Sequence, residues 1–235
     1  YSGDDAAGLA VANQYRSDVA ILQQGVRNAS DGLSDLQIKD GALDNISKLL
    51  DRLSTLATQA ASGQTSSASR VTLNAEFVDV ISEITREATV AGLTAAGGFS
   101  VFVSNNGTSG VVAGSIGAAD ATALAINATT INTQATAQTA VATVAPAIGT
   151  RGTVQGTDGQ LENRLSYAIN LAQSQIVNNR AAESRIRDAN VAASGALLRG
   201  EGGALLYQPQ PQADGIYVFG RNRVNWVDWV GALAF

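Results

Sequence analysis

The sequence contains no histidine, no cysteine and no methionine among its 235 residues. Without histidine, neither a Ser-His-Asp nor a Cys-His catalytic arrangement can form, and a metal would find no imidazole ligand. Without cysteine there is no disulfide, no thiolate nucleophile and no structural zinc site of the usual kind. We therefore expect no enzymatic activity, no cofactor and no bound metal. Because methionine is absent, we also expect Tyr1 to be an internal residue of a longer protein.

Aromatic residues are also scarce, at 5% of the chain, and the net charge is −5 at pH 7. A core of Ala, Leu, Ile and Val with few aromatic rings suits helices that approach each other closely. The acidic balance argues against nucleic acid as a partner, because phosphate binding requires a basic surface. No apolar run reaches about 18 residues, so we expect no transmembrane helix and no membrane partner.

Two long stretches without proline, residues 4–61 and 160–193, carry apolar side chains at alternating spacings of three and four residues. The row in the first stretch is interrupted once, at Asp40. Such a heptad-like stripe predicts long helices that pack against one another. A further helix is predicted at residues 69–91, and its short connection to the first predicts an antiparallel pair.

A small β-hairpin region is predicted at residues 97–130. Residues 99–104 alternate around β-forming side chains, an Asn-Asn-Gly turn follows, and residues 111–116 are the candidate returning strand. A helix is expected to return from about Asn132. The proline and four glycines within residues 146–159 predict a break in that helix.

Residues 194–235 differ from the rest of the sequence. They contain Pro209 and Pro211, several glycines and both tryptophans, Trp226 and Trp229, without a sustained helical period. We expect this atypical tail to be a separate unit, foreign to the rest of the chain. The fold predicted for residues 1–193 is mainly α, an elongated rod of long antiparallel helices resembling a coiled-coil bundle, with a small β-hairpin region.

Five motifs near the two ends of residues 1–193 resemble those of bacterial flagellins, and they occur in the same order. They are D-D-A-A-G-L-A at residues 4–10, N-A-S-D-G at 28–32, G-A-L at 41–43, L-E-N-R-L at 161–165 and S-R-I-R-D-A-N at 184–190. Motifs at both ends, each on a predicted helix, are far more specific than one motif alone.

The resemblance implies a secreted structural subunit of the flagellar filament that supports motility and has copies of itself as its partner. In flagellins the extreme terminal helices line the central channel of the filament. Those helices would lie before Tyr1 and after Ala193, so the chain looks like a core fragment that lacks them. The alternative is a flagellin-like cell-surface protein that binds an acidic polysaccharide or a host surface.

The resemblance also implies two sets of contact residues. One set matches positions that the flagellin-sensing Toll-like receptor contacts: Arg52, Leu56 and Glu76. For this set the alternative is a solvated helix face with Leu56 in the core. The other set carries charge on the predicted C-terminal helix and could contact neighbouring subunits: Arg164, Arg185, Arg187 and Asp188. For these charges, plain solubility is an equally good explanation.

Overall fold

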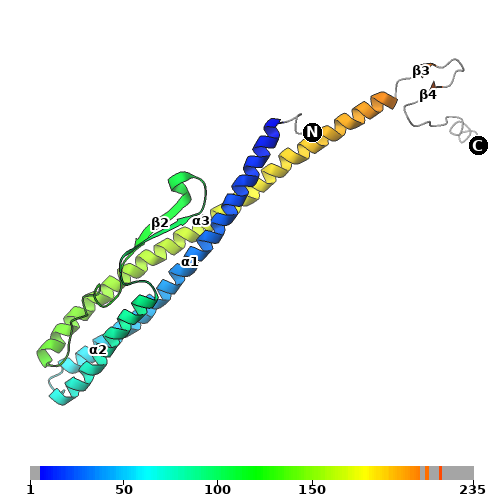
Figure 1. Ribbon diagram of the computed structural model, residues 1–235. Helices are drawn as coiled ribbons and strands as arrows, with labels where there is room; N and C mark the ends of the chain where they lie inside the picture. The colour runs from blue at the N-terminus through cyan, green and yellow to red at the C-terminus, as the bar shows by residue number, and fades with distance from the viewer. Residues whose placement is uncertain (1–5, 207–209, 212–216, 219–235) are drawn as a thin grey trace, which may run out of the picture. The chain divides into compact units, whose positions relative to one another are not determined.

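The computed structural model describes residues 6–206, 210–211 and 217–218. These residues form three α-helices, one turn of 3-10 helix, a two-stranded antiparallel sheet and a second pair of short strands (Figure 1). None of the helices in this part of the chain contains a stretch long and apolar enough to span a membrane.

The chain divides into two units. One unit consists of residues 17–178, and the other consists of residues 1–16 together with 179–235. Helices α1 and α3 each run through both units, and the remaining helix and the larger sheet belong to the first.

Helix α1 spans Ala6–Ala61, a length of 56 residues, which confirms the long first helix. Its apolar stripe faces the core, because side chains three and four residues apart lie on one face of a helix. At the end of the helix, the Arg70 Nε donates to the carbonyl of Ala60 at 2.8 Å, which satisfies one of the carbonyl groups that a helix end leaves without a partner. The buried members of the stripe are Val19, Leu22, Ala29, Leu36, Leu43, Ile46, Leu50, Leu53, Ala57 and Ala60.

Helix α2 spans Ser67–Val90, close to the predicted range. The Ser66 side chain accepts a hydrogen bond from the Ser69 N–H at 3.1 Å and so caps the first turn. The helix is antiparallel to α1, since Arg70 near its start contacts Ala60 and Glu76 farther along contacts Arg52. The side chains that α2 buries are Phe77, Ile81, Ile84 and Ala88.

The larger sheet is a β-hairpin. Strand β1 spans Gly97–Phe102 and strand β2 spans Val111–Ile116, with Phe102 opposite Val111 and Gly97 opposite Ile116. The returning strand therefore has the predicted bounds. The chain reverses through the 3-10 turn η1, Gly107–Gly110, where Gly107 has a φ of 58° that favours glycine.

The predicted β region is wrong beyond Ile116. Residues 117–133 form neither a strand nor a helix and pack irregularly against the core. Ile126 and Ile131 are fully buried, and the Ile131 N–H donates to the Asn74 Oδ1 of α2 at 2.8 Å. The Ala, Thr and Asn residues of this segment lack the alternating β-branched pattern that a strand needs.

Helix α3 spans Gln134–Leu206, a length of 73 residues, and continues through Pro146. The predicted break at residues 146–159 is therefore wrong. Pro146 is exposed, and a Cβ added to Gly149, Gly152 or Gly156 would meet nothing within 4 Å. The helix breakers thus lie away from the face that packs.

The opposite face of α3 explains why the helix persists there. It keeps the three-four spacing through the glycine-rich stretch, with Val144, Ala147, Val154, Leu161 and Leu165 all buried. Burying one large aliphatic side chain stabilises by roughly 1.5–3 kcal/mol. Each glycine in a helix costs about 1 kcal/mol and an internal proline about 3 kcal/mol. Buried side chains recur every three or four residues along α3. Their combined stabilisation offsets the separate costs of the proline and the glycines.

Beyond Ser194, α3 continues to Leu206, so the expectation of no sustained helix in the tail is wrong up to that residue. The continuation contains four leucines and two alanines, which are strong helix formers, and they offset the four glycines there. Strand β3, Gln210–Pro211, pairs with strand β4, Tyr217–Val218. Trp226 and Trp229 lie outside the described residues, and the foreign origin of the tail stays a prediction.

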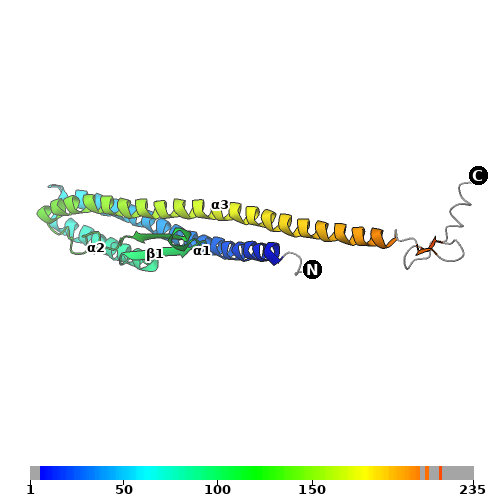
Figure 2. The ribbon, with the colours of Figure 1, turned by 90° about the horizontal axis from the view of Figure 1, so that it is seen from above.

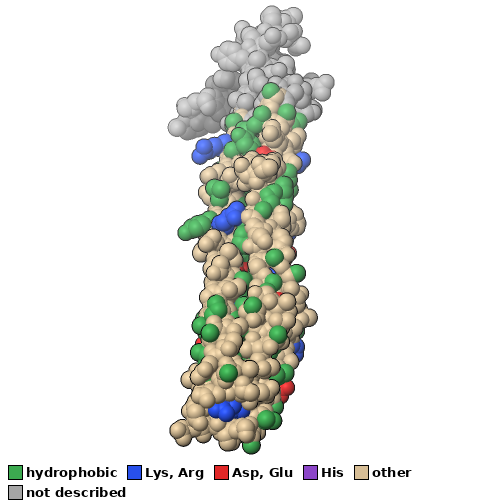
Figure 3. Space-filling view, turned by 90° about the vertical axis from the view of Figure 1, so that its left-hand side faces the viewer, with side chains coloured by type: hydrophobic (Ala, Val, Ile, Leu, Met, Phe, Trp, Pro, Cys, Tyr) green, Lys and Arg blue, Asp and Glu red, His purple; other side chains and the backbone are tan. Residues whose placement is uncertain are grey.

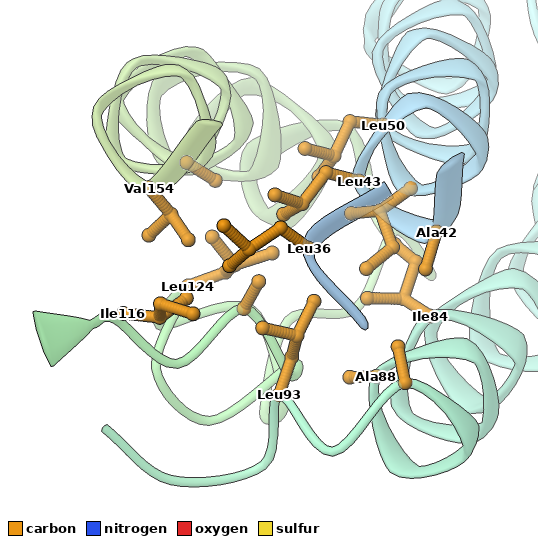
Figure 4. Close-up of a cluster of buried hydrophobic side chains, with 14 of the residues drawn as sticks. Leu36, Ala42, Leu43, Leu50, Ile84, Ala88, Leu93, Ile116, Leu124 and Val154 are labelled. Carbon is orange, nitrogen blue, oxygen red and sulfur yellow. The ribbon is translucent and has the colours of Figure 1, made fainter. Parts of the chain in front are cut away.

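Within residues 17–178, α3 is antiparallel to α1. The Arg151 Nε donates to the carbonyl of Leu43 at 2.9 Å, and the Gln155 Nε2 donates to the Asp40 Oδ1 at 2.9 Å. In this unit the three helices lie side by side in both views (Figures 1 and 2). Figure 4 shows their shared core, with side chains from all three helices and from the segment after α2: Leu36, Leu43, Leu50, Ile84, Ala88, Leu93 and Val154.

Candidate functional site

The β-hairpin is held against α1 by a close backbone approach. A Cβ added to Gly25 would lie 1.7 Å from the carbonyl oxygen of Val103, so only glycine fits at this position. Next to it, the Asn28 Nδ2 donates to the carbonyl of Phe102 at 3.2 Å. Near the tip of the hairpin, the Asn105 Nδ2 donates to the Asp18 Oδ1 at 3.0 Å. These contacts fix the position of the hairpin tip along α1.

The first set of candidate contact residues lies where α1 meets α2. The Arg52 Nε and Nη2 lie 2.7 and 2.5 Å from the Glu76 Oε1, and the two side chains are 50% and 44% exposed. Leu56 is fully buried in the core. The structure therefore brings Arg52 and Glu76 together on the surface and places Leu56 in the core, where a receptor cannot contact it. Its place in the three-four stripe of α1 explains the burial.

Arg164, of the second set, acts within the chain. Its Nη1 donates to the carbonyl of Ala113 in β2 at 2.8 Å, and so connects α3 to the hairpin. Arg164 belongs to the unit of residues 17–178, whereas Arg185, Arg187 and Asp188 belong to the other unit.

The other three members of the second set lie on exposed positions of α3. The Arg187 Nη1 lies 3.2 Å from the Glu183 Oε1, and the Ser184 Oγ donates to the Asp188 Oδ2 at 2.8 Å. Arg185 is exposed. Exposed pairs one helical turn apart contribute about 0.3–0.5 kcal/mol. Their side chains therefore remain available to a partner at little energetic cost.

Ion pairs on the outer faces of α1 and α2 are of the same weak kind. The hydrogen bond from Arg86 holds the pKa of the Glu83 carboxyl below its usual value, and the same guanidinium contacts Glu87 at 2.6 Å. The hydrogen bond from Lys48 lowers the pKa of Asp44. Asp44, Lys48 and Arg86 are exposed and Glu83 and Glu87 are half-buried, so these pairs adjust local charge and contribute little to stability.

Exposed apolar side chains form a further surface that the sequence motifs did not reveal. On α3, Tyr167, Leu171 and Val177 are 73%, 61% and 65% exposed. The sequence could have indicated them, because these apolar residues do not belong to the stripe of α3 that faces the core. On the face that Figure 3 shows, hydrophobic side chains are dispersed among polar ones.

Comparison with known proteins shows a similarity to flagellins. Residues 1–102 match the sequence model of the bacterial flagellin N-terminal helical region. Over this range the chain is similar to flagellins. It is 35% identical over 123 residues to polar flagellin F of Vibrio parahaemolyticus, an alignment that covers 52% of this chain and 31% of that protein. It is 42% identical over 83 residues to flagellin 1 of Proteus mirabilis, covering 35% of this chain and 23% of that protein.

A solved flagellin structure supports the same assignment. The crystal structure of Bacillus cereus flagellin aligns with a TM-score of 0.54 and 29% identity, over 67% of this chain and 94% of that one. The two curated flagellins, by contrast, are matched over 31% and 23% of their own lengths. The predicted fold, long antiparallel helices with a small β-hairpin, is confirmed as a flagellin fold.

Proposed function

We propose that this chain is part of a structural subunit of a bacterial flagellar filament. Its role is to pack against copies of itself, outside the cell, in a polymer that supports motility. Two observations carry the proposal: residues 1–102 match the flagellin N-terminal helical region, and 67% of the chain aligns with a solved flagellin over 94% of that structure. The role is mechanical rather than catalytic.

The surface of α3 supports a polymeric role. Tyr167 and Leu171 lie one helical turn apart and are largely exposed. Without a partner, this apolar surface stays in contact with water, which is unfavourable. Apolar side chains exposed on a single chain become covered when copies associate, and aromatic residues are enriched in such interfaces. We place a contact between subunits on this face of α3.

The charged residues of α3 also suit contacts with a neighbouring subunit. Arg185, Arg187 and Asp188 are exposed, and among the described residues Arg187 pairs with Glu183 and Asp188 with Ser184, both on the same helix. Charges around an interface set its register and orientation more than its strength. Arg164 remains a candidate of the same kind, although it also holds the hairpin.

The test is polymerisation of the full-length gene product, followed by sedimentation and electron microscopy. We expect long helical filaments from the wild type and fewer or shorter ones from Tyr167→Ser with Leu171→Ser. The matched control is Val71→Ser, an exposed apolar residue on α2. Soluble monomers that never assemble would contradict the proposal.

The alternative, binding of an acidic polysaccharide, has less support. A sugar site needs a groove with aromatic side chains. Phe77 and Phe99 are buried in the core, and the exposed aromatic side chains Phe102 and Tyr167 lie on different elements, β1 and α3. The net charge of −5 also opposes an acidic ligand. Retention of unassembled protein on an acidic polysaccharide column would favour this alternative.

We further propose that the Arg52–Glu76 pair is contacted by the flagellin-sensing Toll-like receptor. The pair is exposed and joins two helices, so it presents a fixed charge pattern to a partner. Reporter cells that carry the receptor should respond less to Arg52→Ala with Glu76→Ala than to the wild type. The control is Asp44→Ala with Lys48→Ala, another exposed pair of α1. An equal loss in both variants would contradict the proposal.

A further inference from the structure

One carboxyl group lies inside the packing of α3 where an apolar side chain is expected. Asp158 has no solvent exposure, and it is the only buried polar or charged residue among those whose exposure the structure describes. It continues the stripe that runs from Val154 to Leu161, whose side chains face the hairpin near Gly117 and Gly114. Asp158 therefore sits within the seam that packs α3.

Both oxygens of this carboxyl lack a hydrogen-bond partner within the chain. Buried polar atoms in proteins are nearly always hydrogen-bonded, so an orphaned pair requires an explanation. An ionised carboxylate in this position would lose its hydration without any compensating bond, which is strongly unfavourable. Protonation removes the charge, and with it the largest part of that penalty.

Most of the charged groups around Asp158 are negative and therefore favour its protonated form. Glu162 follows it by one turn on α3, and Asp35 and Asp40 approach from α1. Lys39 is the single cation that opposes them, and it is already paired with Asp35. Strand β2 contains no ionisable residue, and the carboxylate of Asp120, in the segment after it, accepts a hydrogen bond from the Ala123 N–H.

The pKa of Asp158 is raised to about 6. Burial is the largest cause, and Glu162 and Asp40 contribute further. Burial and Asp40 also raise the pKa of Glu162. A metal ion does not explain the cluster, because no three acidic side chains in the described part of the chain are placed to hold one. A proton is the remaining cation that this position can bind.

We propose that Asp158 is a proton-binding switch in the seam between α1 and α3, which strengthens the packing of residues 17–178 when the surroundings become mildly acidic. In the unfolded chain the carboxyl binds its proton only near its ordinary pKa of 3.8, so the folded state holds more protons at intermediate pH. Stability from this group is therefore fully present below about pH 4 and is lost as pH rises through about 6.

The test is urea unfolding of the full chain, followed by circular dichroism, at several pH values between 8 and 5. We compare the wild type with Asp158→Asn, which keeps the shape of the side chain and cannot ionise. The folding equilibrium constant of the wild type, relative to that of Asp158→Asn, should rise about tenfold from pH 8 to pH 5. Other carboxyl groups change with pH in both proteins and cancel in this ratio.

The matched control is Asp51→Asn, an exposed aspartate on α1. Its stability relative to the wild type should not depend on pH. If Asp158→Asn fails to fold, carbon-13 NMR of the Asp158 carboxyl in the wild type decides the question, with an expected midpoint near pH 6. A midpoint near 4, or an unchanged ratio between pH 8 and pH 5, would overturn the proposal.

Discussion

At the scale of single residues, the distance to a neighbouring backbone decides whether a position can accept a side chain larger than that of glycine. Gly25 accommodates the carbonyl of Val103, and Gly110 accommodates the carbonyl of Ser104, where an added Cβ would lie 1.9 Å away. Gly41, on the same helix as Gly25, has nothing within 4 Å. Gly25 is therefore required by a close contact, whereas Gly41 of the same helix is not.

We predict opposite effects for alanine at two glycines of α1. Gly25→Ala must push the hairpin away from the helix, which should lower the free energy of unfolding by about 1–3 kcal/mol. Gly41→Ala meets no neighbour and removes backbone freedom from the unfolded chain, which should raise it by about 0.5–1 kcal/mol. Urea unfolding of both variants measures the difference. Equal effects would contradict the docking of the hairpin on α1.

Leu56 gives a second prediction at this scale. Because it is fully buried, Leu56→Ala should leave a cavity and lower the free energy of unfolding by about 2–5 kcal/mol. The control is Ile38→Ala, since Ile38 is 63% exposed on the same helix and should change stability by about 0.5 kcal/mol or less. Thermal unfolding followed by circular dichroism distinguishes them, and a stable Leu56→Ala would place this side chain on the surface.

Residue burial was partly predictable from the sequence. Leu56 lies in the spacing of Leu53, Ala57 and Ala60, so its burial follows from periodicity, whereas its match to receptor contacts pointed the other way. Asp158 also has the three-four spacing of the apolar stripe of α3. Because it is charged, the sequence pattern predicts a break in the stripe there and not a buried side chain. Only the three-dimensional packing shows that its oxygens have no partner.

At the scale of elements, α3 shows how packing overrides local propensity. Its helix breakers lie on exposed positions, and its buried positions repeat without a gap from Ala137 to Leu165 when Arg151 and Asp158 are included. The Arg151 side chain fills its place in the row by donating to the carbonyl of Leu43. The sequence predicted β2 and α2 well because their patterns are short and uninterrupted, whereas α3 required knowledge of its partners.

We expect substitutions of these breakers to stabilise the isolated chain. Gly152→Ala should raise the free energy of unfolding by about 0.5–1 kcal/mol. Pro146→Ala should raise it by up to about 3 kcal/mol, because it restores a helical hydrogen bond. Urea unfolding at a concentration where the chain does not assemble provides the measurement. A loss of stability in both variants would show that the helix is interrupted there.

At the scale of the whole molecule, family and fold follow from motifs, whereas the division into units does not. The boundaries near residues 17 and 178 fall inside α1 and α3, where the apolar stripes continue without a turn or a change of composition. The helical bundle of residues 17–178 has an apolar interior, and the ion pairs described on its surface are weak. Such a surface suits contacts that form by shape and burial rather than by charge.

We propose that this chain is a building block of a flagellar filament. The most direct measurement is mass spectrometry of filaments that have been sheared from the source bacterium and purified by sedimentation. We predict that peptides from residues 17–178 are a major component of the filament fraction. Their absence from the filaments, together with their recovery as monomers from the cell surface, would contradict the account.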